Sequence, residues 1–403
     1  MKTKWVGVGL LVAPLIYAGV MVALRRAWNS LPGPLSSGEE ELVIDSISPD
    51  KPEASPLSLE RGLRGKVLFF ILVAARNEAA TLPHLLHDLG QQTLPTAQFE
   101  VILVDDHSTD ATAAVAQSAE TQFPLHLIQL AQQPGAPTGK KAALQAALAI
   151  ARAPWVVCTD ADCRVGPDWL RSYAQLIQRE PTTRFISGPV LLTGPDTTLH
   201  RLMGLEFAGL VGVGGACIRA GFPTMCNGAN LAYRHDSFAA VQGFAGNEHL
   251  ASGDDEFLLH KLHAAYPGSI RFLAEASAVV RTAAPPTLVA LLRQRVRWAS
   301  KWRHYHAPAP QRLAVLVLLA NVSLAAGPVL WLRQPGLGLW VGAAWALKLG
   351  GDVWFLSPVV RLLGRRRWLR MVPLLQLAYA PYALGVGLLG LRGGYQWKGR
   401  QVK

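Results

Sequence analysis

The sequence is poor in charged residues. Only 16% of its 403 residues are Asp, Glu, Lys or Arg, whereas about 25% is usual in soluble proteins. Acidic residues are the rarer kind, with 27 against 39 basic ones, so the formal net charge is +12. The missing charge is concentrated in long apolar runs near both ends of the chain, and this distribution argues against an ordinary soluble protein.

Three other features that the sequence lacks exclude classes of function. The four cysteines include no C-x-x-C pair (Cys158, Cys163, Cys217 and Cys226), so we expect reduced, buried thiols that pack as small hydrophobic side chains. No basic patch interleaved with aromatic residues lies away from the apolar runs, so nucleic acid is not an expected partner. The loop AARNEAA after the first predicted strand has no glycine. This argues against a nucleotidyltransferase, because such enzymes cradle a triphosphate in a Gly-rich loop.

The apolar runs predict transmembrane helices. Residues 5–24 are long enough to cross a hydrocarbon core of ~30 Å as a helix. We expect a retained N-terminal anchor over residues 1–26 rather than a cleaved signal peptide, because the run exceeds a usual signal-peptide core. Three more runs lie near the C-terminus, and we expect two or three of them to cross (residues 313–332, 337–360 and 372–391). The middle run contains Lys348 and Asp352, and charges inside a membrane are rare and usually face protein or water.

The basic residues beside these runs predict the orientation. With four crossings, they all lie on the side of residues 27–310 (Arg25, Arg26, the stretch 293–312 and the loop 361–370). The positive-inside rule then places that side in the cytoplasm and the protein in the inner cell membrane. The same count puts the basic tail YQWKGRQVK outside. Either the rule is violated locally, or one C-terminal segment lies along the membrane interface instead of spanning it.

Strand and helix patterns alternate after a linker rich in Pro, Ser and acids at residues 27–65. Apolar runs such as KVLFFILVAA, FEVILV and WVVCT predict buried strands, and the segments between them predict helices. This alternation is typical of an α/β fold with a mostly parallel sheet that helices cover on both faces. Ligands of such sheets bind beyond the carboxyl ends of the strands.

Polar residues follow three of these predicted strands. Arg76 and Glu78 follow the first, Asp105 and Asp106 end the second, and Asp160 and Asp162 end another (Asn77 lies between the first two). Aspartates two positions apart can project the same way from an extended segment, and two close carboxylates repel each other unless a cation lies between them. Mg²⁺ is typically held by one or two carboxylates plus phosphate oxygens. The alternative is a surface turn whose aspartates cap a helix near Trp169. The three strand ends together favour a nucleotide diphosphate with a divalent cation.

Six short segments occur in the order seen in family 2 glycosyltransferases of the GT-A fold: VAARNEAATL, VDDHSTD, GKKAAL, TDAD, ASGDDEFLL and QRVRW. The chain resembles the membrane-bound branch of that family, which includes ceramide glucosyltransferase-like and cellulose or chitin synthase-like enzymes. The resemblance implies a GT-A domain over residues 66–285 and an amphipathic interface segment with the Q-x-x-R-W motif over 286–310. A C-terminal transmembrane region and basic tail follow over 311–403.

The resemblance also implies a role for individual residues. Asp105 and Asp106 match the pair near the nucleotide, Asp160 and Asp162 match the D-x-D that holds Mg²⁺ or Mn²⁺ on the diphosphate, and Asp255 matches the catalytic base, with Asp254 where Glu is common. The other expected donor-site residues are Arg76, Glu78, Lys140, Lys141, Gln294, Arg297 and Trp298. The turn Asn227-Gly228-Ala229-Asn230 resembles the acceptor-side loop.

These matches imply a membrane-bound glycosyltransferase that moves a sugar from a nucleotide-diphosphate donor to a hydroxyl of a lipid or glycan acceptor. The expected mechanism is metal-dependent and inverting, because an acceptor hydroxyl needs a carboxylate to take its proton and the leaving diphosphate needs positive charge. A processive polysaccharide synthase is one alternative. A non-catalytic nucleotide-sugar-binding scaffold is another, but it would be expected to lose the base, whereas this chain keeps Asp254 and Asp255.

Overall fold

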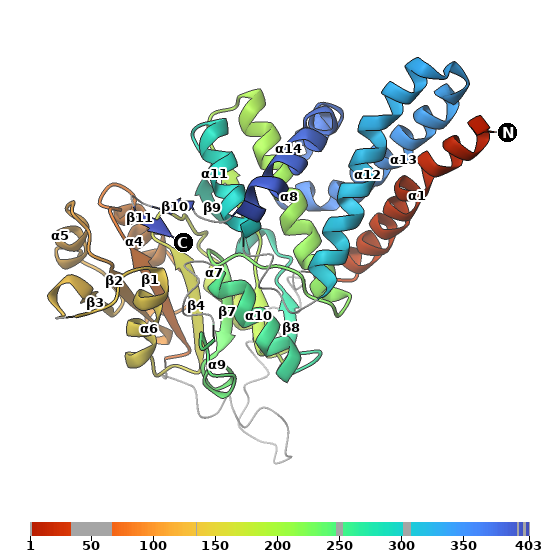
Figure 1. Ribbon diagram of the computed structural model, residues 1–403. Helices are drawn as coiled ribbons and strands as arrows, with labels where there is room; N and C mark the ends of the chain where they lie inside the picture. Colours follow the sequence, from red (N-terminus) through yellow and green to blue (C-terminus); the bar gives the residue numbers. More distant parts are fainter. Residues whose placement is uncertain are drawn as a thin grey trace, which may run out of the picture.

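The structure is a computed structural model that describes residues 2–33, 67–133, 135–246, 253–300, 308–392, 395–397 and 400–402. An α/β domain forms one end of the molecule, and long helices from both ends of the chain project from it (Figure 1). Most of the predicted linker 27–65 lies outside the described residues, as do residues 301–307 of the predicted interface segment.

The main sheet has seven strands in the order β3-β2-β1-β4-β7-β5-β8. The first four strands in this order are parallel, β7 runs antiparallel to β4 and β5, and β8 is parallel to β5. The bounds are β1 (Phe69–Ala75), β2 (Phe99–Asp105), β3 (Leu125–Gln129), β4 (Trp155–Asp160), β5 (Phe185–Ser187), β7 (Leu231–Arg234) and β8 (Ile270–Phe272). β1, β2 and β4 are buried along almost their whole length, as expected where helices cover both faces. The predicted mostly parallel α/β fold is confirmed.

The order of the strands creates a topological switch point between the central strands β1 and β4. The chain runs from β1 to β2 and β3 through α4 (Leu82–Gly90) and α5 (Thr112–Gln117), then returns through α6 (Lys140–Ile150) to place β4 on the other side of β1. Because such crossovers are right-handed, α4 and α5 cover one face and α6 the other. The connections therefore diverge between β1 and β4, where ligands of open α/β sheets bind.

The rest of the α/β domain closes around this switch point. A second, two-stranded parallel sheet pairs β6 with β9. The remaining elements are β6 (Val190–Thr193), β9 (Val280–Ala283), α7 (Trp169–Arg179), α9 (His235–Ala240), α10 (Asp254–Ala265), α11 (Leu288–Ala299) and the 3-10 helices η1 (Thr96–Gln98), η2 (Leu130–Gln132) and η3 (Ala276–Ala278).

Four long helices lie outside the sheet: α1 (Lys2–Asn29), α12 (Pro308–Arg333), α13 (Gly338–Leu362) and α14 (Val372–Arg392). The short helices η5 (Pro335–Leu337) and η6 (Arg366–Met371) connect the last three. α1, α12 and α13 pack side by side as a bundle (Figure 1). The predicted segments 5–24, 313–332 and 372–391 are confirmed as parts of helices that are long and apolar enough to cross a membrane.

The middle predicted span behaves differently. It forms α13, which falls outside the four candidate spans found among the described residues. Lys348 and Asp352 are buried and form an ion pair of 2.6 Å. The Tyr17 hydroxyl of α1 donates to Asp352 at 2.6 Å, and Gln376 of α14 also bonds Asp352. The two charges therefore face other protein groups.

A further long apolar helix was not expected from the sequence. α8 (Thr198–Arg219) meets the length and hydropathy of a membrane span, yet 67% of its most apolar window is buried inside the protein. Its glycines allow close packing, because a Cβ on Gly204 would lie 2.3 Å from Trp368 and one on Gly212 would lie 2.7 Å from Val359. α8 also contacts β6 and β8. It therefore packs between the α/β domain and the long helices.

The C-terminal segment returns to the α/β domain. The end of α14 lies against α11, since a Cβ on Gly390 would be 2.8 Å from Ala299. A hairpin of β10 (Tyr395–Trp397) and β11 (Arg400–Val402) follows, and β10 contacts α11. The C-terminus lies beside the sheet domain, away from the projecting end of the bundle (Figure 1).

Candidate active site

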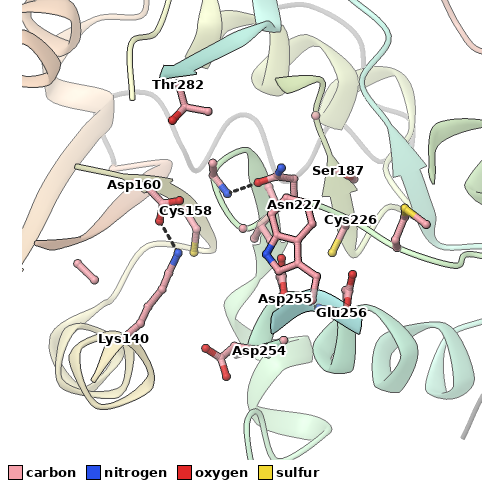
Figure 2. Close-up of a pocket in the computed structure, with 18 of the residues that line it drawn as sticks. Lys140, Cys158, Asp160, Ser187, Cys226, Asn227, Asp254, Asp255, Glu256 and Thr282 are labelled. Atoms are coloured by element: carbon pink, nitrogen blue, oxygen red, sulfur yellow. Dashed lines mark hydrogen bonds and ion pairs between the residues drawn. The ribbon is translucent and has the colours of Figure 1, made fainter. Parts of the chain in front are cut away.

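The strands with polar ends finish level with one another. Ala75 of β1 pairs with Asp105 of β2, and Ala74 pairs with Asp160 of β4. A pocket of about 380 Å³ opens at these ends (Figure 2). Every predicted catalytic, donor-binding or metal residue except Asp105 and Lys141 lines it: Arg76, Glu78, Asp106, Lys140, Asp160, Asp162, Asp254, Asp255, Gln294, Arg297 and Trp298. Of the predicted acceptor-side turn, Asn227, Gly228 and Ala229 line it and Asn230 does not.

Asp105 organises the loop after β2. Its carboxylate accepts hydrogen bonds from the backbone N–H of Ser108, at 3.2 Å, and from the Ser108 hydroxyl. The adjacent loop after β1 is tied to the same turn, because Asn77 accepts from the Thr109 N–H at 2.8 Å. Asn77 has a φ of 55°, a left-handed conformation that asparagine tolerates better than most residues. These bonds hold the two loops together beside the pocket.

Asp106 connects the end of β2 to the start of α6. It is only 2% exposed, and its carboxylate accepts from the backbone N–H of Gly139 at 3.0 Å. Gly139 has a φ of 109°, which glycine adopts without steric cost. The backbone carbonyl of Asp106 accepts from the Arg76 guanidinium at 2.9 Å. Asp106 thereby sets the position at which α6 begins, and so the direction of the two lysines that open it.

Lys140 and Lys141 point to different acidic groups. Lys140 forms an ion pair with Asp160 inside the pocket (Figure 2). Burial opposes the charge of Lys140, but the neighbouring Asp160 and Asp255 outweigh it and raise the lysine pKa above its ordinary value. Lys141 pairs instead with Asp254 at 3.0 Å. Of the two lysines, Lys140 is therefore the one that presents positive charge to the pocket.

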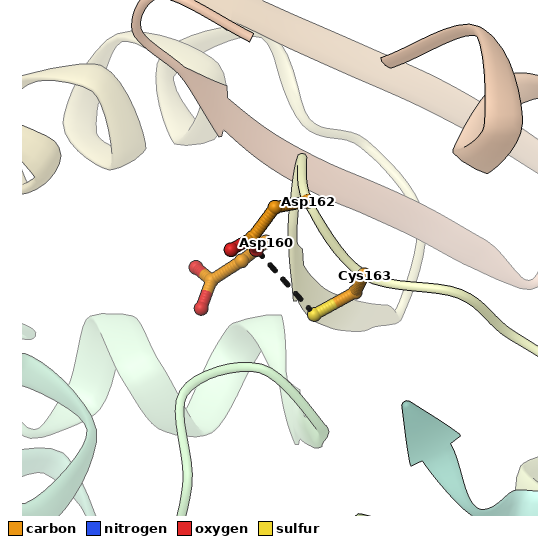
Figure 3. Close-up of side chains that lie close together, drawn as sticks. All are labelled: Asp160, Asp162 and Cys163. Carbon is orange, nitrogen blue, oxygen red and sulfur yellow. Dashed lines mark hydrogen bonds between the residues drawn. The ribbon is translucent and has the colours of Figure 1, made fainter. Parts of the chain in front are cut away.

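Asp160, Asp162 and Cys163 form the candidate metal centre. One ligand atom of each lies within 4.8 Å of the others (Figure 3). Burial, reinforced by Asp160 and Asp162, raises the pKa of the Cys163 thiol, and a sulfur is a soft ligand, whereas hard cations such as Mg²⁺ take oxygen ligands. Two carboxylates remain, which suits a hard cation that takes its other oxygens from phosphate and water. The alternative in which these aspartates cap a helix is wrong, because Asp168 holds the cap position of α7.

Asp254 and Asp255 are neighbours in sequence with different surroundings. Both lie in the first turn of α10, which follows Gly253 in a left-handed conformation. Asp254 is buried and turned toward Lys141, and burial raises its pKa although Lys141 opposes the shift. Asp255 points to the other side (Figure 2), toward Gly228, where an added Cβ would lie 3.3 Å from the Asp255 carboxylate. Gly253 holds the cap position of α10, but the Asp255 carboxylate accepts from the backbone N–H of Glu256 at 3.0 Å, so capping of the helix stays an alternative role for Asp255.

Residues that the sequence did not single out form an apolar wall of the pocket. Phe207, Leu210, Val211 and Gly214 come from α8, and Leu192 and Phe272 come from the two sheets. The only sequence signal for this wall was the apolar character of residues 198–219, which by hydropathy alone looks like one more membrane helix. The lining of the pocket therefore combines carboxylates with apolar side chains.

α11 closes the pocket with the Q-x-x-R-W motif. Gln294, Arg297 and Trp298 line it. The ring of Trp298 lies beside that of Phe207, with 6.1 Å between the ring centres. This part of the wall thus combines an amide, a guanidinium and an indole, groups able to bind a diphosphate and the face of a sugar ring.

Comparison with known proteins gives consistent matches. Residues 70–238 match the family model described as glycosyl transferase family 2. Residues 155–388, more than half of the chain, match the model described as glycosyl transferase family group 2.

Two curated relatives illustrate the similarity. A beta-monoglucosyldiacylglycerol synthase from Nostoc sp. is 34% identical over 129 residues, which are 32% of this chain and 27% of that protein. A poly-beta-1,6-N-acetyl-D-glucosamine synthase from Staphylococcus aureus is 25% identical over 233 residues, 57% of this chain and 53% of that protein. The matched region therefore spans between about a quarter and a half of the length of these relatives.

A solved structure shares the fold. The mannosyltransferase PcManGT from Pyrobaculum calidifontis, solved in complex with GDP-Man and Mn²⁺, superposes with a TM-score of 0.54. The match covers 91% of this chain and 99% of that one at 20% identity. At that identity the likeness shows the fold alone, which is the GT-A fold.

Proposed function

The chain belongs to glycosyl transferase family group 2, and from that premise we propose that it transfers a sugar from a nucleotide-diphosphate donor to a hydroxyl group of a membrane lipid. The observation that carries this proposal is the composition of one pocket. Its lining combines the carboxylates of Asp160, Asp162 and Asp255 with apolar residues of α8. A polar headgroup at the carboxylates and hydrocarbon against α8 would match both kinds of lining.

The donor binds at the strand ends. Asp160 and Asp162 would hold Mg²⁺ or Mn²⁺, and the ion would supply positive charge to the diphosphate. Arg76, Glu78 and Asp106 line the nucleotide side. Arg297 binds the diphosphate, because its planar fork meets two phosphate oxygens at once. Lys140 adds a second positive charge beside Asp160.

Asp255 acts as the general base. It takes the proton of the acceptor hydroxyl while that oxygen bonds to the anomeric carbon, and the bond from this carbon to the diphosphate breaks. Attack opposite the leaving group inverts the anomeric configuration. Asp254, paired with Lys141, keeps α10 in place against α6.

The acceptor separates this proposal from its main alternative. One relative is named for a glucosyl lipid and another for a polysaccharide, so a processive polysaccharide synthase is the second candidate. The apolar wall of α8 supports the lipid. The test incubates the purified protein with labelled nucleotide sugars and either membrane lipid extract or oligosaccharides. We expect label in a single glycolipid; label only in a long glycan would favour the synthase, and no turnover with any donor would favour a non-catalytic scaffold.

The same proposal includes a membrane topology with the catalytic domain in the cytoplasm. Trp368 of the basic loop 361–370 packs on Gly204 of α8. This contact supports a loop on the same side of the membrane as the α/β domain. The contact of Gly390 with Ala299 supports the alternative in which α14 lies along the interface rather than leaving the domain, which keeps the basic tail in the cytoplasm too. The test places an engineered cysteine in the loop 361–370 and treats intact cells with a thiol reagent that does not cross the inner membrane. Labelling of that cysteine would contradict this topology.

A further inference from the structure

A buried ion pair lies next to the Q-x-x-R-W motif. Arg295 of α11 is 4% exposed and Glu206 of α8 is 9% exposed. Two nitrogens of the Arg295 guanidinium donate to the two carboxylate oxygens of Glu206, at 3.1 and 2.6 Å. Both residues fall outside the set of described residues that line the pocket, so neither is placed to touch a substrate.

Arg295 contacts two motif residues that do line the pocket. A third guanidinium nitrogen donates to the side-chain oxygen of Gln294. The guanidinium also lies over the indole of Trp298, 4.3 Å from the ring centre, and 5.5 Å from that of Phe207. One planar group therefore holds an amide by a hydrogen bond and an indole by stacking, which a lysine ammonium cannot do in the same geometry.

The energetics of such a pair argue against a purely stabilising role. Removing two charges from water costs about as much as their attraction returns, and replacing a buried pair by apolar residues of similar volume is often neutral for stability. A stack on an aromatic ring and a forked hydrogen bond do, however, restrict where side chains can lie. Beyond stability, this pair therefore supplies a fixed orientation of the side chains that Arg295 contacts.

We propose that Arg295 is a positioning residue that fixes the side chains of Gln294 and Trp298 for the acceptor, and that Glu206 holds Arg295 for this purpose. This inference rests on the proposed glycosyl transfer. Because Trp298 lies beside Phe207 of the apolar wall, which the proposed function gives to the lipid, the inference assigns Gln294 and Trp298 to the acceptor instead of the donor role expected from the sequence. Arg297 and the strand-end carboxylates are left to the donor.

A third residue extends this arrangement to the long helices. The hydroxyl of Tyr382, on α14, donates to Glu206 at 3.0 Å. Glu206 thus receives hydrogen bonds from α11 and α14 while it belongs to α8. The position of α14 is thereby coupled to the orientation of Trp298 through two side chains.

The deciding variant is Arg295→Lys, which keeps the charge but loses the planar fork and the stack. We expect the catalytic efficiency toward the acceptor to fall by about tenfold or more, since small misplacements of substrate-positioning groups cost up to about a hundredfold. Binding of the nucleotide diphosphate with Mn²⁺, measured by calorimetry, should stay within about twofold of wild type. The matched control is Arg179→Lys, which changes an ion pair with Glu275 (2.7 Å) that lies away from the pocket, and its kinetics should equal those of wild type.

A second variant keeps the test informative if single substitutions misfold. The double change Glu206→Met with Arg295→Met removes both charges, so we expect a melting temperature equal to or above that of wild type together with the same loss toward the acceptor. Tyr382→Phe should lower acceptor efficiency by a few-fold, and Tyr379→Phe on the same helix should leave it unchanged.

The outcomes separate this inference from the function on which it rests. Arg295→Lys and the double variant with wild-type acceptor kinetics would overturn the positioning role alone. Equal loss of donor binding and acceptor efficiency, with a lowered melting temperature, would also overturn it, because that pattern is a general structural defect. Wild-type protein that transfers sugar to no acceptor would overturn the proposed function, and this inference with it.

Discussion

Two clusters of charged side chains in this protein have different partners. At the strand ends, Asp160 and Asp255 are partly exposed in a pocket, and a lysine ammonium is the cation beside them. Among the long helices, Lys348 and Asp352 bind each other and are enclosed by Tyr17 and Gln376. An ionisable residue inside a membrane is by default a candidate functional site. The comparison teaches that the enclosing partners decide: the first set leaves room for a ligand, whereas the second set is closed by protein groups.

The largest effect should come from Asp255→Asn. The amide keeps the shape and the hydrogen bond to the Glu256 N–H (3.0 Å) but cannot accept a proton. We expect a transfer rate lower by about 10²–10⁴-fold, with donor binding unchanged. Steady-state kinetics and calorimetry on the same preparation measure both. Asp254→Asn is the companion variant. If it is inactive while Asp255→Asn turns over normally, the general base is Asp254 and not Asp255.

The closed cluster should respond in stability instead. Lys348→Met leaves Asp352 buried without its ammonium partner, and breaking a buried pair in this way costs about 3–5 kcal/mol of unfolding free energy. We expect a lower melting temperature in detergent and normal turnover per folded molecule. Lys348→Met combined with Asp352→Leu should recover most of the stability. A loss of activity in this stable double variant would assign the cluster a function and break the comparison.

A third effect concerns the candidate metal centre. Asp162→Ala removes one of two carboxylates that lie within reach of a single ion. Changes even in the residues that support a metal ligand cost 10–100-fold in affinity, so loss of a ligand should lower the Mn²⁺-linked gain in nucleotide-diphosphate affinity by more than about tenfold. Calorimetry with and without Mn²⁺ measures this gain. The same metal-linked gain in the variant would exclude Asp162 as a ligand.

The smallest expected effect is that of Tyr17→Phe. This change removes one hydrogen bond to Asp352 from the closed cluster, and Gln376 and Lys348 still contact that carboxylate. We expect a loss of about 1–2 kcal/mol of stability, because the bond is to a charged acceptor, and no change in kinetics. A drop in turnover without a drop in melting temperature would contradict the assignment of this cluster to packing.

Much of the fold and the site could be predicted from local sequence. Continuous apolar strands, the polar residues that end them and the Q-x-x-R-W motif predicted the α/β sheet and most of the charged residues that line the pocket. The apolar runs at both ends predicted the long helices. These features are readable because the period of burial and the polarity of a strand end depend on residues close together in the chain.

Only the tertiary structure distinguished neighbours of the same type. Lys140 faces the pocket while Lys141 pairs with Asp254, and Asp105 binds its own loop while Asp106 lines the site. It also decided that the apolar residues 198–219 are mostly buried beside the sheet, and that Arg295 meets Glu206 across 89 positions of sequence. Such outcomes depend on which distant surfaces pack together. That packing is a property of the whole chain, so no local pattern of residues determines it.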